Sequence, residues 1–483
     1  MASSFYGVFR FEDQGIRISG PTAKKNRVHR RCLWPRSEIR NRVVSRKPFV
    51  NFDDLDLAVQ RCALPVVRGR ITAVEELSLS ALLPGARIGA RVEVSRPGTE
   101  PLAAEVVACD GERARLMPFC STTGVGPGDQ VVKVPGARSL PCGTGLLGRV
   151  IDPFGRPLDG RGPLADVATW PLDRPAPDPL ARQPVDQQLE TGLRAIDGCA
   201  SLGLGQRVGL FAGPGLGKTT LLGILARRAS CDVAVICLVG ERGREVRDFL
   251  DRILGAEGLA RTCVVLATAD APPLVRVNAL LAATAVAEWF RDQSEHVLLL
   301  VDSLTRVVRA RRDVALSLGE QPARSGFPAS AFSALPGLLE RGGRSDKGSI
   351  SAVYAVLTEN TVDDPVAEEA RSLLDGHIVL DTAAARAGRW PAIDVLESVS
   401  RVMDAVVDRE QMGHAATLRR WLGAYRENED LILMGAYRRG TSSDTDSALD
   451  RKQVIDAFLA QDASRSSSVE QTRKALADLV GGA

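Results

Sequence analysis

The sequence predicts a multidomain protein with a small N-terminal β-barrel, a central α/β domain and a C-terminal helical domain. Three observations support this prediction. The 483 residues are too many for a single hydrophobic core. Short alternating runs separated by turn signals fill residues 49–140, apolar strand-like runs alternate with helix-like segments within 141–405, and helical patterns continue through 406–483. Hydrophobic residues make up 45% of the chain and charged residues 25%, which is ordinary for a soluble globular protein.

Residues 1–48 form a basic extension that we expect to be disordered. Residues 1–50 carry 12 Lys/Arg and 3 Asp/Glu, or +9 in a chain of net charge +3, so the remainder carries −6. A basic arm can meet an anionic membrane or a partner, but a solvated tail or a wrongly assigned start would look the same. The acidic remainder lacks the strongly basic surface that nucleic-acid binding favours.

Composition argues against several other classes. No run approaches the ~18 apolar residues of a membrane span, and the N-terminus lacks the apolar region of a signal peptide. The nine cysteines contain no C-x-x-C pair, and several lie in apolar runs, so we expect small core residues in a reducing cytosol. With four scattered histidines, no zinc site is predicted.

The barrel prediction depends most on a hairpin. Strand-like runs at 105–109 and 113–117 flank Asp110-Gly111, a pair that suits a tight turn. Further short strands are predicted at 66–71 and 92–94. Aromatic residues are sparse here, which favours a structural or oligomer-forming role over oligonucleotide binding. The Gly/Pro-rich residues 141–185 read as an ordered connection to the next domain.

The central domain shows apolar runs that predict parallel strands covered on both faces. These runs lie at 232–239, 264–267, 297–301, 350–357 and 378–380. A helix is predicted to begin at Pro272-Pro273, since proline is tolerated in a first helical turn. In the helical tail, Thr441–Asp446 is predicted as a loop, and Ser468-x-x-Gln471 as a capping box before the last helix.

The strongest single motif is a glycine-rich turn between an apolar strand (208–211) and an apolar helix (221–226). It reads Ala212-Gly213-Pro214-Gly215-Leu216-Gly217-Lys218-Thr219-Thr220. This order is that of a P-loop, whose backbone N–H groups surround a polyphosphate at a helix N-terminus. Lys218 would reach the β/γ-phosphates and the Thr219 hydroxyl would bind Mg²⁺. Ala212 replaces the first glycine of the usual pattern.

Two carboxylates end predicted strands of the same domain. Asp302 follows the run 297–301, which we place next to the P-loop strand, where a carboxylate would hold Mg²⁺ directly or through water. Glu241 follows the run 232–239 and is placed to polarise an attacking water. From spacing alone, Glu241 reads equally well as part of an exposed charge run.

Seven motifs follow one another in fixed order through the chain. They are GLLGRVIDPFGRPLDGRGPL (145–164), TGLRAIDG (191–198), AGPGLGKTT (212–220), GERGREV (240–246), VLLLVDSLTR (297–306), SLLDGHIVL (372–380) and PAIDVLESVSRV (391–402). Together they resemble the type III export ATPase family, which comprises the flagellar export ATPase and the ATPase of virulence-type type III secretion. That family is related to rotary F-type ATPase β subunits. The resemblance covers residues 60–480, approximately.

The resemblance implies a RecA-like α/β core between the barrel and the helical domain, in a homohexamer with sites between subunits. It implies an active ATPase that uses ATP and Mg²⁺ to energise protein export through a flagellar or virulence-type apparatus. The implied partners are stalk and regulator proteins, an export gate and chaperone–cargo complexes, without nucleic acid. The implied location is cytoplasmic, peripheral at the inner face of the cytoplasmic membrane.

The resemblance also assigns roles by motif position. Glu241 matches the family's catalytic carboxylate, Arg242 a neighbouring charge, and Arg401 the arginine supplied by the adjacent subunit. Non-catalytic subunits of rotary ATPases lack the carboxylate at Glu241, so an active subunit is expected, with Lys218 among its catalytic residues. Trp390 falls where relatives place an aromatic ring against adenine, although a core tryptophan is the alternative.

Two other functions are alternatives to protein export. An RNA translocase resembling the transcription terminator Rho shares the barrel-plus-RecA plan, but predicts a basic, aromatic barrel. A β-type catalytic subunit of ATP synthase is expected to carry GERTRE where this chain has GERGRE. Between the two export systems the signals conflict, because residues 427–431 and 435–437 are flagellar-like and residues 443–446 resemble the virulence type.

Overall fold

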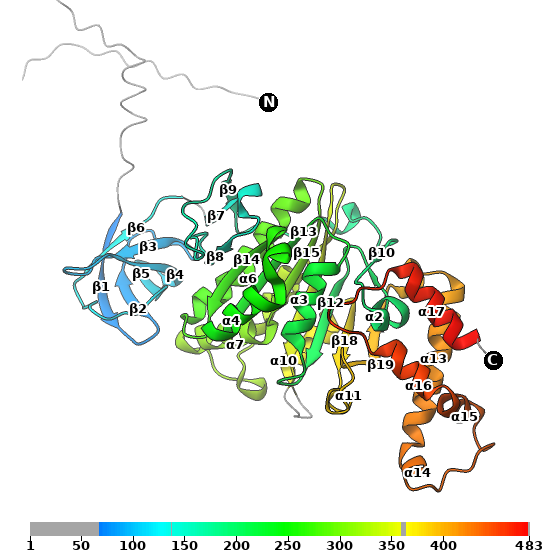
Figure 1. Ribbon diagram of the computed structural model, residues 1–483. Helices are drawn as coiled ribbons and strands as arrows, with labels where there is room; N and C mark the ends of the chain where they lie inside the picture. The colour runs from blue at the N-terminus through cyan, green and yellow to red at the C-terminus, as the bar shows by residue number, and fades with distance from the viewer. Residues whose placement is uncertain (1–66, 137, 359–363, 482–483) are drawn as a thin grey trace, which may run out of the picture. The chain divides into compact units, whose positions relative to one another are not determined.

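A computed structural model describes residues 67–136, 138–358 and 364–481 (Figure 1). These residues belong to one compact unit, Pro65–Ala483. The predictions made for the basic extension 1–48 lie outside the described residues. None of the helices among the described residues is long and apolar enough to cross a membrane.

The N-terminal part of the described chain is a closed six-stranded barrel with strand order β1-β2-β5-β4-β3-β6. Its strands are β1 (Arg68–Val74), β2 (Leu79–Leu82), β3 (Arg91–Val94), β4 (Leu102–Asp110), β5 (Arg113–Pro118) and β6 (Gln130–Lys133). The predicted hairpin is confirmed, because Asp110 pairs with Arg113 and Gly111 takes a positive φ of 56° in the turn. Alternate side chains fill the barrel, among them Leu79, Leu102 and Leu116, each 0% exposed.

The Gly/Pro-rich segment after the barrel is ordered, and one of its strands pairs with the central sheet. Strand β7 (Ser139–Cys142) pairs with β9 (Ala168–Pro171), and β8 (Val150–Ile151) joins the central sheet beside β14 (Thr262–Thr268). Gly145 is required where the chain folds back on itself, since a Cβ there would lie 1.7 Å from the carbonyl oxygen of Ala165.

The central sheet has nine strands within the described part of the chain, in the order β19-β18-β12-β17-β15-β13-β14-β8, with β16 paired to β17 (Figure 1). Besides β8 and β14, the bounds are β12 (Arg207–Ala212), β13 (Val233–Glu241), β15 (His296–Asp302), β16 (Gly343–Arg344), β17 (Ser349–Leu357), β18 (Gly376–Leu380) and β19 (Ile393–Ser400). The five strands predicted from apolar runs are confirmed, and their pairings with one another and with β12 are parallel. Only β16 and β19 run antiparallel to their neighbours in this described sheet.

Successive side chains of β13 point to opposite faces of the sheet, and helices cover both faces. Val235 and Cys237 belong to one buried cluster with residues of α6 (Pro273–Asp292) and α7 (Leu304–Ser317), while Ile236 belongs to another with α3 (Lys218–Arg228). Helix α6 begins as predicted, with Pro272 as its N-cap.

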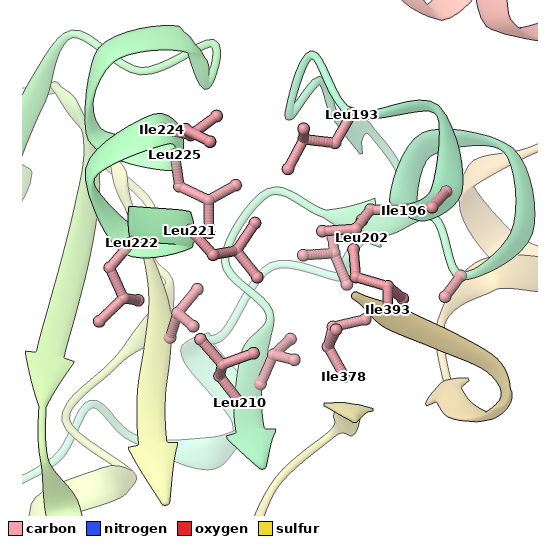
Figure 2. Packing of buried hydrophobic residues seen from close by; sticks show 14 of the residues in the cluster. Leu193, Ile196, Leu202, Leu210, Leu221, Leu222, Ile224, Leu225, Ile378 and Ile393 are labelled. Carbon is pink, nitrogen blue, oxygen red and sulfur yellow. The ribbon is translucent and has the colours of Figure 1, made fainter. Parts of the chain in front are cut away.

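Figure 2 shows the second cluster, in which Leu221 and Leu225 of α3 extend toward Leu193, Leu202 and Leu210. Leu210 comes from β12, so the helix packs against the strand that leads into it. This packing fixes the turn between strand and helix.

The C-terminal region is helical, as predicted. Its helices are α13 (Arg409–Glu427), α14 (Glu429–Leu433), α15 (Ser443–Asp450), α16 (Lys452–Leu459) and α17 (Val469–Gly481). The capping box before the last helix is confirmed, because Ser468 N donates to Gln471 Oε1 at 3.0 Å and Gln471 N donates to Ser468 Oγ at 3.2 Å.

The prediction of a loop over Thr441–Asp446 is wrong. Helix α15 begins at Ser443, and the Ser442 hydroxyl caps it by accepting from Thr445 N. Two aspartates in the first turn, Asp444 and Asp446, complement the positive end of the helix dipole. The polar composition that resembled a loop is therefore that of a helix N-terminus.

Candidate active site

The glycine-rich turn joins β12 to α3 as a P-loop does. Gly215 and Gly217 have positive φ angles of 76° and 78°, which glycine adopts without strain, and Gly217 is the N-cap of α3. Ala212 needs no such freedom, because it is the last residue of β12 and pairs with Leu357 of β17. Alanine in place of the usual first glycine is therefore accommodated by the strand itself.

Lys218, Thr219 and Asp302 meet at the carboxyl edge of the sheet. Lys218 Nζ forms an ion pair with Asp302 Oδ1, and Thr219 Oγ1 donates to Asp302 Oδ2 at 3.0 Å. Asp302 is 0% exposed, so a cation is needed beside it. The expectation that its strand lies next to the P-loop strand is wrong, since β17 lies between β12 and β15. The first residues of α3 bridge that gap.

Glu241 is the last residue of β13 and is 7% exposed. The alternative that it belongs to an exposed charge run is therefore wrong. Burial raises the pKa of Glu241 to about 7, helped by a hydrogen bond with Glu245 and by the negative charge of Asp302. The charges of Arg306 and Lys218 act in the opposite direction on this pKa. A carboxyl group that titrates near neutrality is suited to accept a proton at physiological pH.

Arg306 is a site residue that the sequence reasoning missed. It lies in the first turn of α7, and its Nη2 is 3.2 Å from Glu241 Oε1. Its position four residues after Asp302, at the end of the VLLLVDSLTR motif, was the available signal.

Arg242 lies apart from this cluster. It is the N-cap residue of α4 (Gly243–Asp248), its side chain is 82% exposed, and its Nη1 is 3.7 Å from Glu245 Oε1. Within this subunit Arg306, rather than Arg242, is the arginine that contacts Glu241.

A pocket of about 280 Å³ opens beside the P-loop. Its walls are formed by Gly215, Leu216, Gly217, Thr220, Leu221, Ile224, Leu380, Trp390, Pro391, Ala392, Gln461 and Ala463. The Trp390 ring packs over Gly217, where a Cβ would lie 2.9 Å from the indole. Trp390 is 45% exposed, so the alternative of a core tryptophan is wrong. Gln461 and Ala463, from the helical region, form a wall that sequence spacing did not reveal.

Arg401 stands at the opposite edge of the sheet from the P-loop of the same chain. It directly follows β19, whose Ser400 pairs with Gly376 of β18, and the next residue of β18 pairs with Gly209 of β12. Gly376 therefore lies level with Val208 of β12, which is four residues before Ala212. Four residues of a strand span about 13 Å at ~3.3 Å per residue. The Arg401 side chain is exposed, with Nη2 3.4 Å from the carbonyl oxygen of Arg371.

Two protein families match consecutive parts of the chain. Residues 192–400 match the ATP synthase alpha/beta family, nucleotide-binding domain, and residues 407–478 match the T3SS EscN ATPase C-terminal domain. Among individual proteins, the flagellum-specific ATP synthase of Pseudomonas aeruginosa is 44% identical over 431 residues, covering 88% of this chain and 96% of its own. The SPI-2 type 3 secretion system ATPase of Salmonella typhimurium is 50% identical over 394 residues, covering 81% and 90%.

Solved structures agree with these matches. The assembled ATPase EscN of the enteropathogenic E. coli type III secretion system superposes with a TM-score of 0.81 at 42% identity, covering 85% of this chain and all of that one. The same ATPase in complex with its central stalk EscO gives a TM-score of 0.79 at the same identity and coverage.

Proposed function

Because this chain belongs to the type III export ATPase family and is an ATPase, we propose that it hydrolyses ATP with Mg²⁺ to energise protein export through a flagellar or virulence-type apparatus. The observation that carries the catalytic part is the buried carboxylate of Glu241 beside Arg306, at the sheet edge that also holds Lys218 and Asp302. The match of residues 407–478 to the EscN C-terminal family favours export over the Rho-like and ATP synthase β-type alternatives.

The P-loop is proposed to hold the nucleotide. Gly213 to Thr220 would surround the phosphates, with every residue except Pro214 able to donate a backbone N–H group. Lys218 would turn from Asp302 to the β/γ-phosphates. Trp390 would stack against the adenine in the neighbouring pocket.

The residues present fit a magnesium ion bound jointly with phosphate. Among the described residues no three His, Cys, Asp or Glu side chains gather as a metal site, so an all-protein cage is not formed there. Mg²⁺ is usually bound by one or two carboxylates together with substrate phosphates and water. Thr219 and Asp302, joined at 3.0 Å, supply one hydroxyl and one carboxylate for that purpose. The ion would neutralise phosphate charge.

Glu241 is proposed as the group that orients and deprotonates the attacking water. Its carboxylate is held at the end of β13, and Arg306 keeps a positive charge beside it. Arg242 is proposed as a further charge of the site, acting from its exposed position at the start of α4.

Arg401 is proposed to complete the site of an adjacent subunit in a homohexamer. Its place at the edge opposite its own P-loop supports a role in trans, because a positive charge at the transition state must contact the γ-phosphoryl group. The solved relative bound to its stalk supports a stalk partner for this chain also. We further propose regulator proteins, an export gate and chaperone–cargo complexes as partners, at the inner face of the cytoplasmic membrane and without nucleic acid.

The test replaces the native chain in its organism with the Lys218→Ala variant and measures exported substrates. We expect export to fall while the variant accumulates normally. Lys347→Ala, an exposed lysine in the turn before β17, is the matched control. Export at the native level by Lys218→Ala would contradict the proposal, and ATP hydrolysis by the purified chain that RNA stimulates would favour the translocase alternative.

A further inference from the structure

The residue before β18 fixes the backbone at Arg401. The carbonyl oxygen of Asp375 accepts a hydrogen bond from Arg401 N at 3.0 Å, and another from Nε2 of the buried Gln206 at 3.0 Å. Gly376 lets the two strands approach closely, because a Cβ there would lie 2.5 Å from the carbonyl oxygen of Val399. Arg401 therefore leaves the sheet from a well-defined point.

The Asp375 side chain is itself clamped by Arg207, the first residue of β12. Asp375 Oδ2 accepts from the backbone N and from Nε of Arg207 at 3.1 and 3.0 Å, and Oδ1 accepts from Nη2 at 3.0 Å. Asp375 N returns a bond to the carbonyl oxygen of Arg207 at 2.8 Å. A bidentate arginine–carboxylate pair fixes orientation as well as charge. The clamp thus links the P-loop strand to the turn that anchors Arg401.

We propose that Asp375 is a positioning residue for Arg401, and that its clamp to Arg207 determines where the Arg401 guanidinium stands in the neighbouring subunit's site. This inference rests on the proposed role of Arg401 in trans. Replacing Asp375 is expected to slow hydrolysis at the neighbour's P-loop, because Asp375 lies at the amino ends of the parallel strands, away from its own P-loop.

The first experiment measures kcat and KM for ATP in Asp375→Asn. A displacement of about 1 Å in a catalytic group can cost about 10²-fold in rate, so we expect kcat to fall by about 10- to 100-fold with KM unchanged. Glu340→Gln is the matched control, because Glu340 Oε1 lies 2.5 Å from Arg207 Nη1 on the other side of the clamp. We expect that control to stay within about twofold of the native kcat, consistent with the mutational spread of partly exposed ion pairs.

The second experiment mixes Asp375→Asn subunits with Lys218→Ala subunits before assembly. The Lys218→Ala subunit cannot use its own P-loop but carries an intact Arg401, so it completes the site of an Asp375→Asn neighbour. We expect the mixture to hydrolyse ATP faster than the sum of the two variants alone. Arg207→Lys, which keeps the charge but loses the bidentate geometry, gives the same test if Asp375→Asn folds poorly.

A parallel mixture of Arg401→Ala with Lys218→Ala subunits distinguishes the positioning role of Asp375 from the role of Arg401 in trans. Rescue of Arg401→Ala without rescue of Asp375→Asn or Arg207→Lys would overturn the positioning role and leave the trans arginine in place. Native activity of Asp375→Asn alone would overturn the positioning role as well. Failure of Arg401→Ala to be rescued would overturn the proposed function of Arg401, and the inference would fall with it.

Discussion

Arg306 Nη2 lies 3.2 Å from Glu241 Oε1, and this contact joins the first turn of α7 to the end of β13. The Glu241 side chain is 9% exposed, while 26% of the Arg306 side chain is exposed. A buried carboxylate beside a partly solvated guanidinium has a pKa that its neighbours can move in either direction. The proposed water-activating role of Glu241 can therefore be tested through its pH dependence.

Arg306→Ala is expected to raise the pKa of Glu241 further, because the positive charge that opposes protonation is lost. A base works only when deprotonated, so the acid limb of the kcat–pH profile should move to higher pH. Arg306→Lys keeps the charge and should move the limb less. An unmoved limb in Arg306→Ala would show that this contact does not govern the titrating group.

Glu245→Gln is expected to shift the same limb to lower pH. The hydrogen bond with Glu245 raises the pKa of Glu241, whereas a glutamine amide would donate to the ionised carboxylate and favour it. The pH profile of kcat is again the measurement, now with the opposite sign from Arg306→Ala. A shift in the same direction as Arg306→Ala would contradict this account of the Glu241 environment.

Trp390→Ala is expected to weaken nucleotide binding with little change in kcat. Stacking of a base on an aromatic side chain contributes about 1–3 kcal/mol, so the dissociation constant should rise by roughly 5- to 150-fold. Titration with a fluorescent ATP analogue measures this change, and Trp390→Tyr, which keeps a ring, should recover most of the affinity. Equal affinity of the alanine variant and the native chain would exclude stacking by Trp390.

Ala212→Gly, which restores the usual P-loop glycine, is expected to bring no gain in ATP affinity. Because Ala212 is the last residue of β12 and is 1% exposed, glycine there should instead lower the free energy of unfolding by about 0.5–1 kcal/mol. Urea unfolding and ATP titration measure the two quantities. A marked gain in ATP affinity would mean that the loop requires a backbone conformation which alanine resists.

The local parts of the site could be predicted from the sequence. Lys218 and Thr219 follow a strand and begin a helix, and Glu241 and Asp302 end apolar strands, so each signal lies within a few consecutive residues. The parts that depend on tertiary packing could not. The Arg306–Glu241 contact joins two distant segments, and the pocket beside Trp390 includes Gln461 from the helical region.

The order of strands in the sheet and the start of one helix also could not be predicted from the sequence. Strand β17, which is late in the chain, inserts between β12 and β15, so chain order did not give the neighbour of the P-loop strand. At residues 441–446 the same polar residue types serve loops and helix caps. The helix is distinguished by the backbone bond from Asp446 N to the carbonyl oxygen of Ser442 at 2.9 Å, beside the cap bond from Thr445 N to Ser442 Oγ.

Phosphate release by purified Glu241→Gln is the most direct measurement of the central claim, that this buried carboxylate activates the attacking water. General base catalysis contributes about 10²–10⁴-fold, so kcat with Mg²⁺ and ATP should fall by that factor while ATP affinity stays near the native value. Hydrolysis by Glu241→Gln at the native rate, in protein that still binds ATP, would contradict the claim.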